Sequence, residues 1–433
     1  MSKIKKVLII GNFWPYTPFG SKRILSLAKF LPDYGWEPRI LTQQLREKPD
    51  KQFKVIETDY QCFLGKWVKF LGLKENEDLG EQLRGRFESI QLESKSWFRF
   101  FYRILREILA YPDEYKNWKP FAIGAARDIF QKEKIDALIS VYPLTSHIIA
   151  DELKRKYEIP WIADLTDLWS DNSAYIYSNL RKFIDKKLEL KTLTSADILT
   201  TSSPPLAERL KKLHKRNSVF TIWLGFDAEI FDKPLSNPTP KFTITYTGFL
   251  YPKKRDPTKF FAVISKLLSD GKIDSRDIEV RFFSPIKKET EEKIKKYRLS
   301  GVVKQYEMIP LKECINKQRE SQILLQLNWE DPKEKGVFSG KLFDYLAARR
   351  PILAAGGAGK DEVVKEILTK THAGVYASSI DEIEHDLFKF YMEYKQKGKI
   401  EYRGKWEEVE KFSTKKSTKK FGELLNQITE KKP

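Results

Sequence analysis

Three short segments of this 433-residue chain combine residue types that bind phosphate groups. In the most informative of them, Ser339 and Gly340 precede a short helical pattern that begins at Lys341. The first turn of a helix presents free backbone N–H groups and the positive end of the helix dipole to an anion. Asp344, one turn into this helix, could accept hydrogen bonds from two sugar hydroxyls. A capped helix of no function would show the same spacing.

A second segment follows an expected strand over residues 242–247. Gly248 leaves this strand, and three consecutive cations that include Lys254 and Arg255 come a few residues later. Cations at that place would neutralise the charge of a diphosphate. A solvated loop without function is the alternative interpretation.

A third segment joins an expected strand over 6–10 to an expected helix over 21–34. Gly20 and Ser21 stand where that helix begins, so their backbone N–H groups could meet an anion, although such loops also cap helices for structural reasons. Neither the G-x-G-x-x-G fingerprint nor the G-x-x-x-x-G-K-[ST] loop occurs, which argues against a dinucleotide enzyme and a P-loop ATPase.

These segments need a scaffold, and strand-like runs that alternate with helical patterns predict parallel sheets with crossover helices. The sequence therefore predicts an α/β protein with two doubly wound Rossmann-like domains that face each other across a cleft, where ligands bind at the carboxyl ends of the strands. The expected strands lie at 6–10, 38–42, 137–141, 161–164 and 198–202 in the first half, and at 242–247, 278–283, 302–306, 323–327, 351–354 and 374–376 in the second.

The predicted domain boundary is a segment over 226–241 that holds three prolines, which resist both helix and central strand. The first domain is expected over 1–228, with an insertion at 52–118, and the second over 241–400. A closing helix over 410–433 is expected to pack on the first domain.

The composition narrows the class of protein and of partner. Hydrophobic residues make up 41% and charged residues 32% of the chain, which is enough apolar material for a folded globular protein. A net charge of +19 favours anionic partners. Only two cysteines, Cys62 and Cys314, occur, and no apolar run is long enough to span a bilayer. We expect a cytoplasmic protein.

Residues 95–111 predict an amphipathic cationic helix. Arg99, Arg103 and Arg106 fall on one stripe, and aromatic and aliphatic side chains occupy the remaining arc. Such a helix could lie on an anionic membrane surface, which would make the protein peripheral at the inner membrane face. An ordinary helix that buries its apolar side in the domain is the alternative.

Four segments in this order resemble the retaining nucleotide-sugar glycosyltransferases of the GT-B fold, in the glycosyl transferase group 1 (family 4) class that builds capsules, O-antigens and other glycans. The resemblance covers nearly the whole chain. Its segments are the loop at Gly20 and Ser21, the exit of the strand at 246–248 with the cations behind it, the stretch 341–354, and the stretch 160–169, which looks like the Asp-Leu-Arg-Asp-x-Trp segment of one bacterial subgroup.

The resemblance implies roles for particular residues of the donor site. Arg255 or its neighbour Lys254 would hold the donor diphosphate, the helix over 341–348 would face the phosphates, and Asp344 would bind the ribose in place of the usual glutamate. The residues expected to bind the donor are Gly20, Ser21, Gly248, Lys254, Arg255, Ser339, Gly340, Lys341 and Asp344, and the residues expected to take part in catalysis are Arg255 and Asp167, which would line the acceptor side.

The resemblance also implies a metal-independent reaction without a cofactor, assisted by the phosphate of the donor itself. No Asp-x-Asp pair occurs in the chain to hold a metal ion. The expected partners are a nucleotide sugar and a glycan or lipid-linked acceptor, with no nucleic acid, since no recognised nucleic-acid module occurs.

Four positions depart from the pattern of the family. Gly336 stands where the Glu-x7-Glu pattern has its first glutamate, so that contact to the donor sugar is absent unless Glu334 or Asp331 substitutes. Thr166 replaces an arginine, and Ser21 replaces the second glycine of the first loop. His147 is expected inside a helix as a core or capping residue rather than in the loop where many relatives carry a histidine. A non-catalytic GT-B protein that binds nucleotide or glycan, or serves as a complex subunit, is therefore the alternative function.

Overall fold

The chain forms two compact units in the computed structural model. Unit 1 comprises residues 1–202, 207–222 and 418–433, and unit 2 comprises residues 203–206 and 223–417. The change of unit after Ile222 precedes the proline-rich segment at 226–241 in which we expected the boundary. The structure describes residues 4–13, 22–45, 51–60, 107, 111–172, 177–232, 236–251, 253–331, 336–357 and 362–430.

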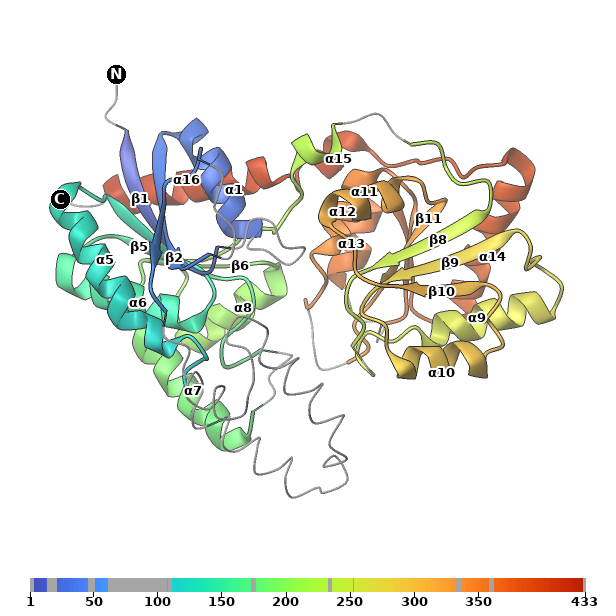
Figure 1. The fold of residues 1–433 in the computed structure, drawn as a ribbon, viewed down its shortest axis with the longest axis horizontal. Coiled ribbons are helices and arrows are strands. Elements are labelled where there is room, and N and C mark those ends of the chain that lie inside the picture. The colour runs from blue at the N-terminus through green and yellow to red at the C-terminus, as the bar shows by residue number, and fades with distance from the viewer. Residues whose placement is uncertain are drawn as a thin grey trace. The chain divides into compact units, whose positions relative to one another are not determined.

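Unit 1 is built on a parallel sheet of seven strands in the order β3-β2-β1-β4-β5-β6-β7, with helices on both faces (Figure 1). Its strands are β1 (Lys5–Ile10), β2 (Trp36–Gln43), β3 (Val55–Thr58), β4 (Ala137–Ser140), β5 (Trp161–Leu165), β6 (Ile198–Thr201) and β7 (Val219–Thr221). Its helices are α1 (Lys22–Phe30), α5 (Lys119–Lys132), α6 (Leu144–Tyr157), α7 (Asn179–Leu193) and α8 (Pro204–His214), with short 3-10 turns at Leu31–Tyr34 and Lys116–Trp118.

Unit 2 is built on a parallel sheet of six strands in the order β10-β9-β8-β11-β12-β13. Its strands are β8 (Phe242–Thr247), β9 (Ile278–Phe283), β10 (Val303–Tyr306), β11 (Ile323–Leu327), β12 (Ile352–Ala355) and β13 (Gly374–Ala377). Its helices are α9 (Thr258–Ser269), α10 (Lys288–Lys296), α11 (Leu311–Arg319), α12 (Lys341–Ala348), α13 (Glu362–Thr371), α14 (Ile380–Lys397) and α15 (Trp406–Glu410), with a 3-10 turn at Ala228–Phe231.

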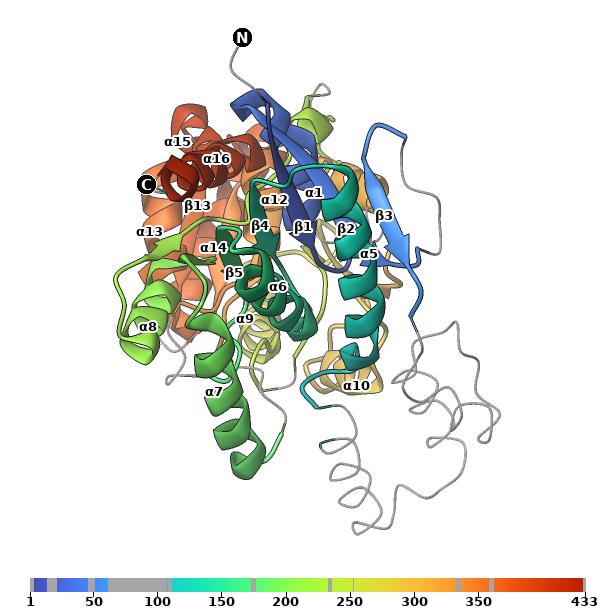
Figure 2. The same ribbon diagram turned by 90° about the vertical axis from the view of Figure 1, so that its left-hand side faces the viewer.

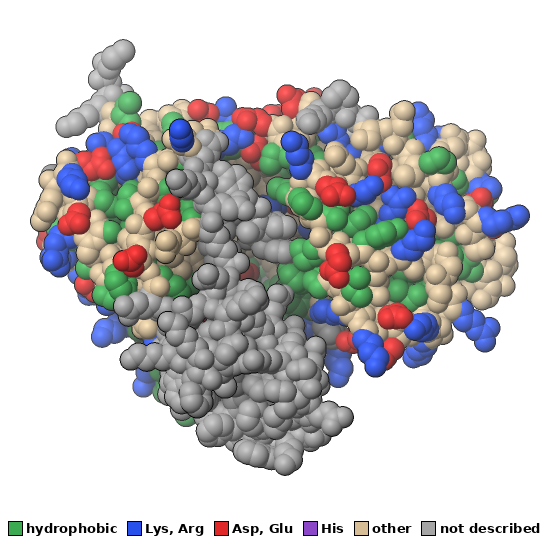
Figure 3. Space-filling view, in the orientation of Figure 1, with side chains coloured by type: hydrophobic (Ala, Val, Ile, Leu, Met, Phe, Trp, Pro, Cys, Tyr) green, Lys and Arg blue, Asp and Glu red, His purple; other side chains and the backbone are tan. Residues whose placement is uncertain are grey.

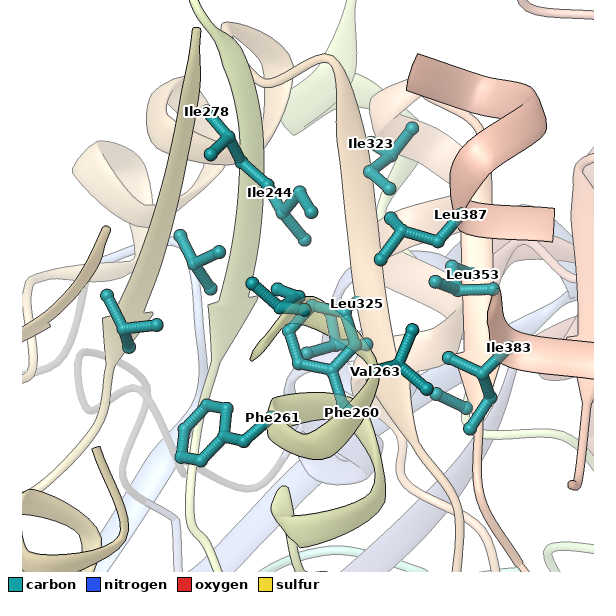
Figure 4. Close-up of a cluster of buried hydrophobic side chains, with 14 of the residues drawn as sticks. Ile244, Phe260, Phe261, Val263, Ile278, Ile323, Leu325, Leu353, Ile383 and Leu387 are labelled. Atoms are coloured by element: carbon teal, nitrogen blue, oxygen red, sulfur yellow. The ribbon is translucent and has the colours of Figure 1, made fainter. Parts of the chain in front are cut away.

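Strand pleating gives the sheet of unit 2 two separate cores. Ile323 and Leu325 of β11 lie in a cluster with α9 and α14, and Figure 4 shows them in this cluster together with Phe260 of α9 and Leu387 of α14. Leu324, between them, points to the opposite face and packs with α12 and α13. A strand that is buried on both faces must be apolar throughout, which is why the run at 323–327 predicts a central strand.

Unit 1 is completed by α16 (Thr414–Glu430), the last helix of the chain. Phe421 and Leu425 of α16 share one core cluster with Ile9 of β1 and Leu27 of α1. Figures 1 and 2 show α1 and α16 on one face of this sheet and α5 and α6 on the other.

The structure confirms the predicted fold class and most of the predicted strands. All paired strands of both sheets run parallel, and β8, β9 and β11 have the predicted limits. The prediction that residues 52–118 form an insertion is wrong at its start, because Val55–Thr58 pairs with β2 as the edge strand β3. The short strand β7 also lacked a prediction, since three residues carry too little periodicity.

Two predictions fall on parts of the chain that the structure does not describe. The loop at Gly20 and Ser21 lies outside the described residues, and so does the cationic helix over 95–111 apart from Glu107 and Tyr111.

None of the helices in the described ranges is long and apolar enough to cross a membrane. On the face of unit 2 in Figure 3, lysine and arginine side chains are interspersed with acidic ones.

Replacement of Phe421 by alanine tests the role of α16 in unit 1. The side chain is fully buried, so we expect Phe421→Ala to lower the free energy of unfolding of unit 1 by about 3–5 kcal/mol. Urea unfolding, followed by fluorescence and circular dichroism, measures this change. Lys419→Ala on the exposed side of the same helix is the control and should change stability by less than about 0.5 kcal/mol. An unchanged unit 1 transition in Phe421→Ala would contradict the assignment.

Candidate functional site

The candidate site lies at the carboxyl edge of the unit 2 sheet, where three neighbouring strands end. Gly248 follows β8, Asn328 follows β11 and Gly356 follows β12, and these strands are adjacent in the sheet. The chain leaves β8 and β11 in opposite directions along the sheet, which is the arrangement that opens a ligand crevice in doubly wound folds. The topology of unit 2 therefore brings together the predicted donor-site loops that lie in this unit.

Gly248 makes a sharp exit from β8 possible. Its φ is +105°, a conformation that side chains disfavour, and its N–H donates to the carbonyl of Phe283 over 2.8 Å. A Cβ atom at this position would lie 3.2 Å from Nζ of Lys341. The glycine therefore keeps the space beside the Lys341 side chain clear.

The loop after Gly248 turns back so that its cations lie against aromatic rings. The N–H of Arg255 donates to the carbonyl of Tyr251 over 2.7 Å, which closes the turn. Nζ of Lys254 and Cζ of Arg255 lie 5.2 Å and 5.6 Å from the ring centroid of Trp329. Cation–π contacts of this kind favour a positive charge. Arg255 is 7% exposed, and its Nε has no hydrogen-bond partner.

Lys341 begins α12 and reaches back over the end of β8. Its Nζ lies 3.6 Å from the ring centroid of Tyr246, is buried and has no hydrogen-bond partner. Burial lowers the pKa of the Lys341 amine well below its usual range, and the charge of Arg255 lowers it further. Within the described part of the chain, neither Nζ of Lys341 nor Nε of Arg255 has a hydrogen-bond partner that could balance a charge.

A buried tyrosine fixes α12 against the end of β8. The hydroxyl of Tyr345 accepts a hydrogen bond from the N–H of Thr247 over 2.9 Å, and Nε2 of Gln318 donates to Oγ1 of Thr247 over 3.1 Å. Burial raises the pKa of the Tyr345 hydroxyl, so it stays protonated near neutral pH. This hydrogen bond sets the position of Lys341, one turn earlier on the same helix.

The start of α12 differs in one detail from the prediction. The N-cap residue is Gly340, with no hydrogen bond from a capping side chain, so Ser339 does not cap the helix through its hydroxyl. The carbonyl of Ser339 accepts the N–H of Leu342 over 3.0 Å instead. Asp344 lies in the first turn of the helix and is half-buried. The predicted residues of this segment thus lie together at one helix start.

Sequence reasoning missed a second group of polar residues at the same edge. Nδ2 of Asn328 donates to the carbonyl of Gly356 over 3.1 Å, while its Oδ1 is buried without a partner. Glu330 accepts the N–H of Gly357 over 3.0 Å and pairs with Lys259 over 2.8 Å. The signal for them was their position directly after the apolar run 323–327, at the end of a central strand.

In unit 1, the two aspartates of the stretch 160–169 have different environments. Asp164 is buried and pairs with Arg23 of α1 over 2.9 Å, and Oγ1 of Thr200 donates to it over 2.6 Å. Asp164 is therefore a structural residue. Asp167 lies in the loop after β5, and its side chain is exposed. Protein atoms around the carboxyl still remove part of its hydration, which raises its pKa.

His147 lies inside α6 as a core residue, which confirms the prediction for it. Its Nδ1 is 2.7 Å from Oγ of Ser140, which also accepts a hydrogen bond from Nε1 of Trp161 over 2.8 Å. Burial lowers the pKa of His147 to about 3, so the ring is neutral in the folded protein.

No protein-family model and no curated protein matches the sequence. Solved structures do match it along nearly its whole length. A glycosyltransferase from Rickettsia africae ESF-5 is 13% identical, with a TM-score of 0.60, and the match covers 99% of both chains. Sucrose-phosphate synthase from Thermosynechococcus elongatus is 12% identical, with a TM-score of 0.61, over 98% of this chain and 99% of that chain.

A third match is the N-terminal domain of the Candida albicans trehalose-6-phosphate phosphatase. It is 11% identical, with a TM-score of 0.64, over 98% of this chain and 97% of that chain. At such identities the likeness establishes the fold alone. The chain has the two-domain GT-B fold, as the sequence motifs predicted.

The buried imidazole of His147 makes stability depend on pH. The unfolded chain binds a proton near pH 6.5 while the folded chain does so only near pH 3, so stability falls as the pH drops between these values. We expect a loss of about 2 kcal/mol from this group between pH 7 and pH 5. Urea unfolding at both pH values measures it. In His147→Gln this component should be absent, and an equal pH dependence in both proteins would contradict the prediction.

Proposed function

We propose that the chain is a glycosyltransferase that moves a sugar from a nucleotide-sugar donor to a glycan or lipid-linked acceptor, in the synthesis of a polysaccharide or glycoconjugate. The observation that carries the proposal is a pair of basic side chains at the carboxyl edge of the unit 2 sheet, in which Nε of Arg255 and Nζ of Lys341 are buried and have no hydrogen-bond partner. They come from different elements and have no carboxylate partner among the described residues. A diphosphate would supply the missing negative charge.

The same residues suit the chemistry of glycosyl transfer. As the bond between the sugar and the diphosphate breaks, negative charge grows on the phosphate that leaves. Fixed cations in a site with little water stabilise such charge more strongly in the transition state than in the bound donor. Arg255, whose guanidinium lies near the rings of Tyr251 and Trp329, is pre-organised for this role. Asp344 would orient the ribose, and Asp167 of unit 1 would line the acceptor side.

We also propose that the reaction retains the configuration of the sugar and needs no metal ion or cofactor. Among the described residues, no group of three His, Cys, Asp or Glu side chains could hold a metal. The cations of the unit 2 site would then stabilise the charge on the phosphate oxygens, as a divalent ion does in other phosphate chemistry.

One observation favours the alternative of a non-catalytic binding protein. Gly336 stands where the family pattern has a glutamate, and its φ of +79° disfavours any side chain there. Incubation with a panel of UDP- and GDP-sugars, following release of free nucleotide with and without EDTA, separates the two functions. Release that persists in EDTA supports a metal-independent transferase. Binding without release would favour the alternative, and release that stops in EDTA would overturn metal independence.

Replacement of the predicted donor contacts tests the position of the site. We expect Arg255→Ala and Asp344→Ala each to weaken nucleotide-sugar binding by about 2–3 kcal/mol, because each removes a charge-assisted contact. Calorimetric titration of the full chain measures the effect. Arg276→Ala, at an exposed arginine of unit 2 that is paired with Asp274, is the matched control and should bind like wild type. If both site variants also bind like wild type, the diphosphate lies elsewhere.

A further part of the proposal is contact with an anionic membrane surface at the cytoplasmic face. The predicted helix at 95–111 lies outside the described residues, but α7 offers independent support. Leu180, Phe183 and Ile184 follow one side of this helix and are 70%, 56% and 41% exposed. Exposed apolar side chains at this spacing are typical of helices that lie on membranes.

The charges of α7 fit an anionic surface. Lys186, Lys187 and Lys191 are exposed on the helix. Its two acidic residues, Asp185 and Glu189, are buried at 1% and 0% exposure. The exposed side of the helix therefore carries positive charge only, beside apolar groups that could enter the headgroup region.

Vesicle binding tests this surface. We expect wild type to sediment with phosphatidylglycerol vesicles but not with phosphatidylcholine vesicles. Lys187→Glu with Lys191→Glu should weaken that binding about thirtyfold or more, since each basic residue contributes about 1 kcal/mol. Phe183→Glu should also weaken it, whereas Ile380→Glu, at an exposed apolar residue of unit 2, is the control. Unchanged partitioning of the α7 variants would remove α7 from the proposal.

A further inference from the structure

The side chain of Lys341 ends in surroundings that suit a neutral amine better than an ammonium ion. Its Nζ has no exposed surface and no hydrogen-bond acceptor among the described residues. Nζ lies 3.6 Å from the ring centroid of Tyr246, and a Cβ atom at Gly248 would lie 3.2 Å from it. A buried ammonium ion normally has a carboxylate or several acceptors around it.

The groups that face the amine from neighbouring elements do not supply a negative charge. Arg255, from the loop after β8, repels a proton on the amine, and the thiol of Cys314 on α11 is the group whose charge would favour one. Tyr246 of β8 and Tyr345 of α12 itself are neutral, because burial raises the pKa of both hydroxyls. Asp344 lies one turn along α12, and its charge is not among the causes that act on the amine.

Two opposing effects decide the charge of this amine in the empty site. The face of Tyr246 attracts a cation, but a single ring is a weaker partner than the water that burial removes. Burial is the largest influence and lowers the pKa of the amine well below its usual range, and Arg255 acts in the same direction. The buried position of the amine and the charge of Arg255 therefore both favour the neutral form of Lys341.

We propose that Lys341 is stored as a neutral amine over Tyr246 and takes up one proton from solvent when the phosphates of a ligand bind beside Arg255. The inference rests on the proposed function, because it takes the ligand to be a diphosphate. The amine gains one proton, the buffer loses one, and the new ammonium ion pairs with the phosphate oxygens. Since Nζ has no exposed surface over Tyr246, this pairing requires rotation about the flexible side-chain bonds of Lys341.

The proton makes donor binding sensitive to pH in a specific way. Above the pKa of the empty site, each unit of pH should weaken binding about tenfold until the pKa of the occupied site is reached. A sugar nucleotide is the suitable probe, because a free nucleoside diphosphate has a terminal phosphate that itself titrates near pH 6.

Calorimetric titration of the full chain with UDP-glucose and GDP-mannose, in buffers of different ionisation enthalpy, counts the protons. We expect wild type and Arg276→Ala to take up close to one proton per bound ligand. Lys341→Arg, whose charge is permanent, and Lys341→Met, which has none, should bind with no uptake. Binding by wild type with no dependence of the measured enthalpy on the buffer would overturn the proposal.

A measurement on the empty protein separates failure of this inference from failure of the proposed function. The ¹³Cε signal of Lys341, assigned by its loss in Lys341→Met, reports the charge of the amine without any ligand. A midpoint well below the ordinary lysine value of about 10.4 supports the proposal, and a midpoint near that value overturns it. If neither probe binds to wild type, the proposed donor fails while the titration still decides the state of Lys341.

Discussion

The parallel direction of the strands is the constraint on which the candidate site depends. Since all strands of a sheet end at the same edge, loops that are far apart in the sequence must meet there. Gly248 after β8, Asn328 after β11 and Gly356 after β12 are neighbours for this reason. The helix α12 adds Lys341 to the same edge, and the hydrogen bond between Tyr345 and Thr247 fixes it there. The topology of the sheet therefore brings together polar and basic residues from segments that are far apart in the sequence.

The two units differ in whether a buried basic side chain has a carboxylate partner. In unit 1, Arg23 is buried against Asp164, and the pair is completed by Thr200, so the charge is balanced within the fold. In unit 2, the guanidinium of Arg255 and the amine of Lys341 lie against aromatic rings and have no such partner among the described residues. A buried basic group without a counter-charge lowers stability, and proteins retain such groups mainly where a ligand pairs with them. The contrast distinguishes the structural ion pair of unit 1 from the candidate site of unit 2.

The sequence predicted the fold well because apolar runs such as 242–247 and 323–327 are buried on both faces and therefore have a strong pattern. It failed for the edge strand β3, whose four residues are only partly buried, and for β7, which is shorter still. Within the candidate site, local motifs indicated Gly248, Arg255 and Lys341, whose functional roles stay predictions. Tyr246, Trp329 and Asn328 were missed, because their importance arises from contacts across strands and helices. The pairing of Asp164 with Arg23 was invisible for the same reason.

The position of α16 has a consequence for how the protein is made. A ribosome synthesises the strands of unit 1 first and then all of unit 2, and only afterwards the helix that carries Phe421 and Leu425. Until that helix emerges, the apolar face formed by Ile9 and Leu27 lacks its cover. The core of unit 1 therefore cannot be completed until α16 has been synthesised, and until then the nascent chain exposes an apolar surface that chaperones could bind.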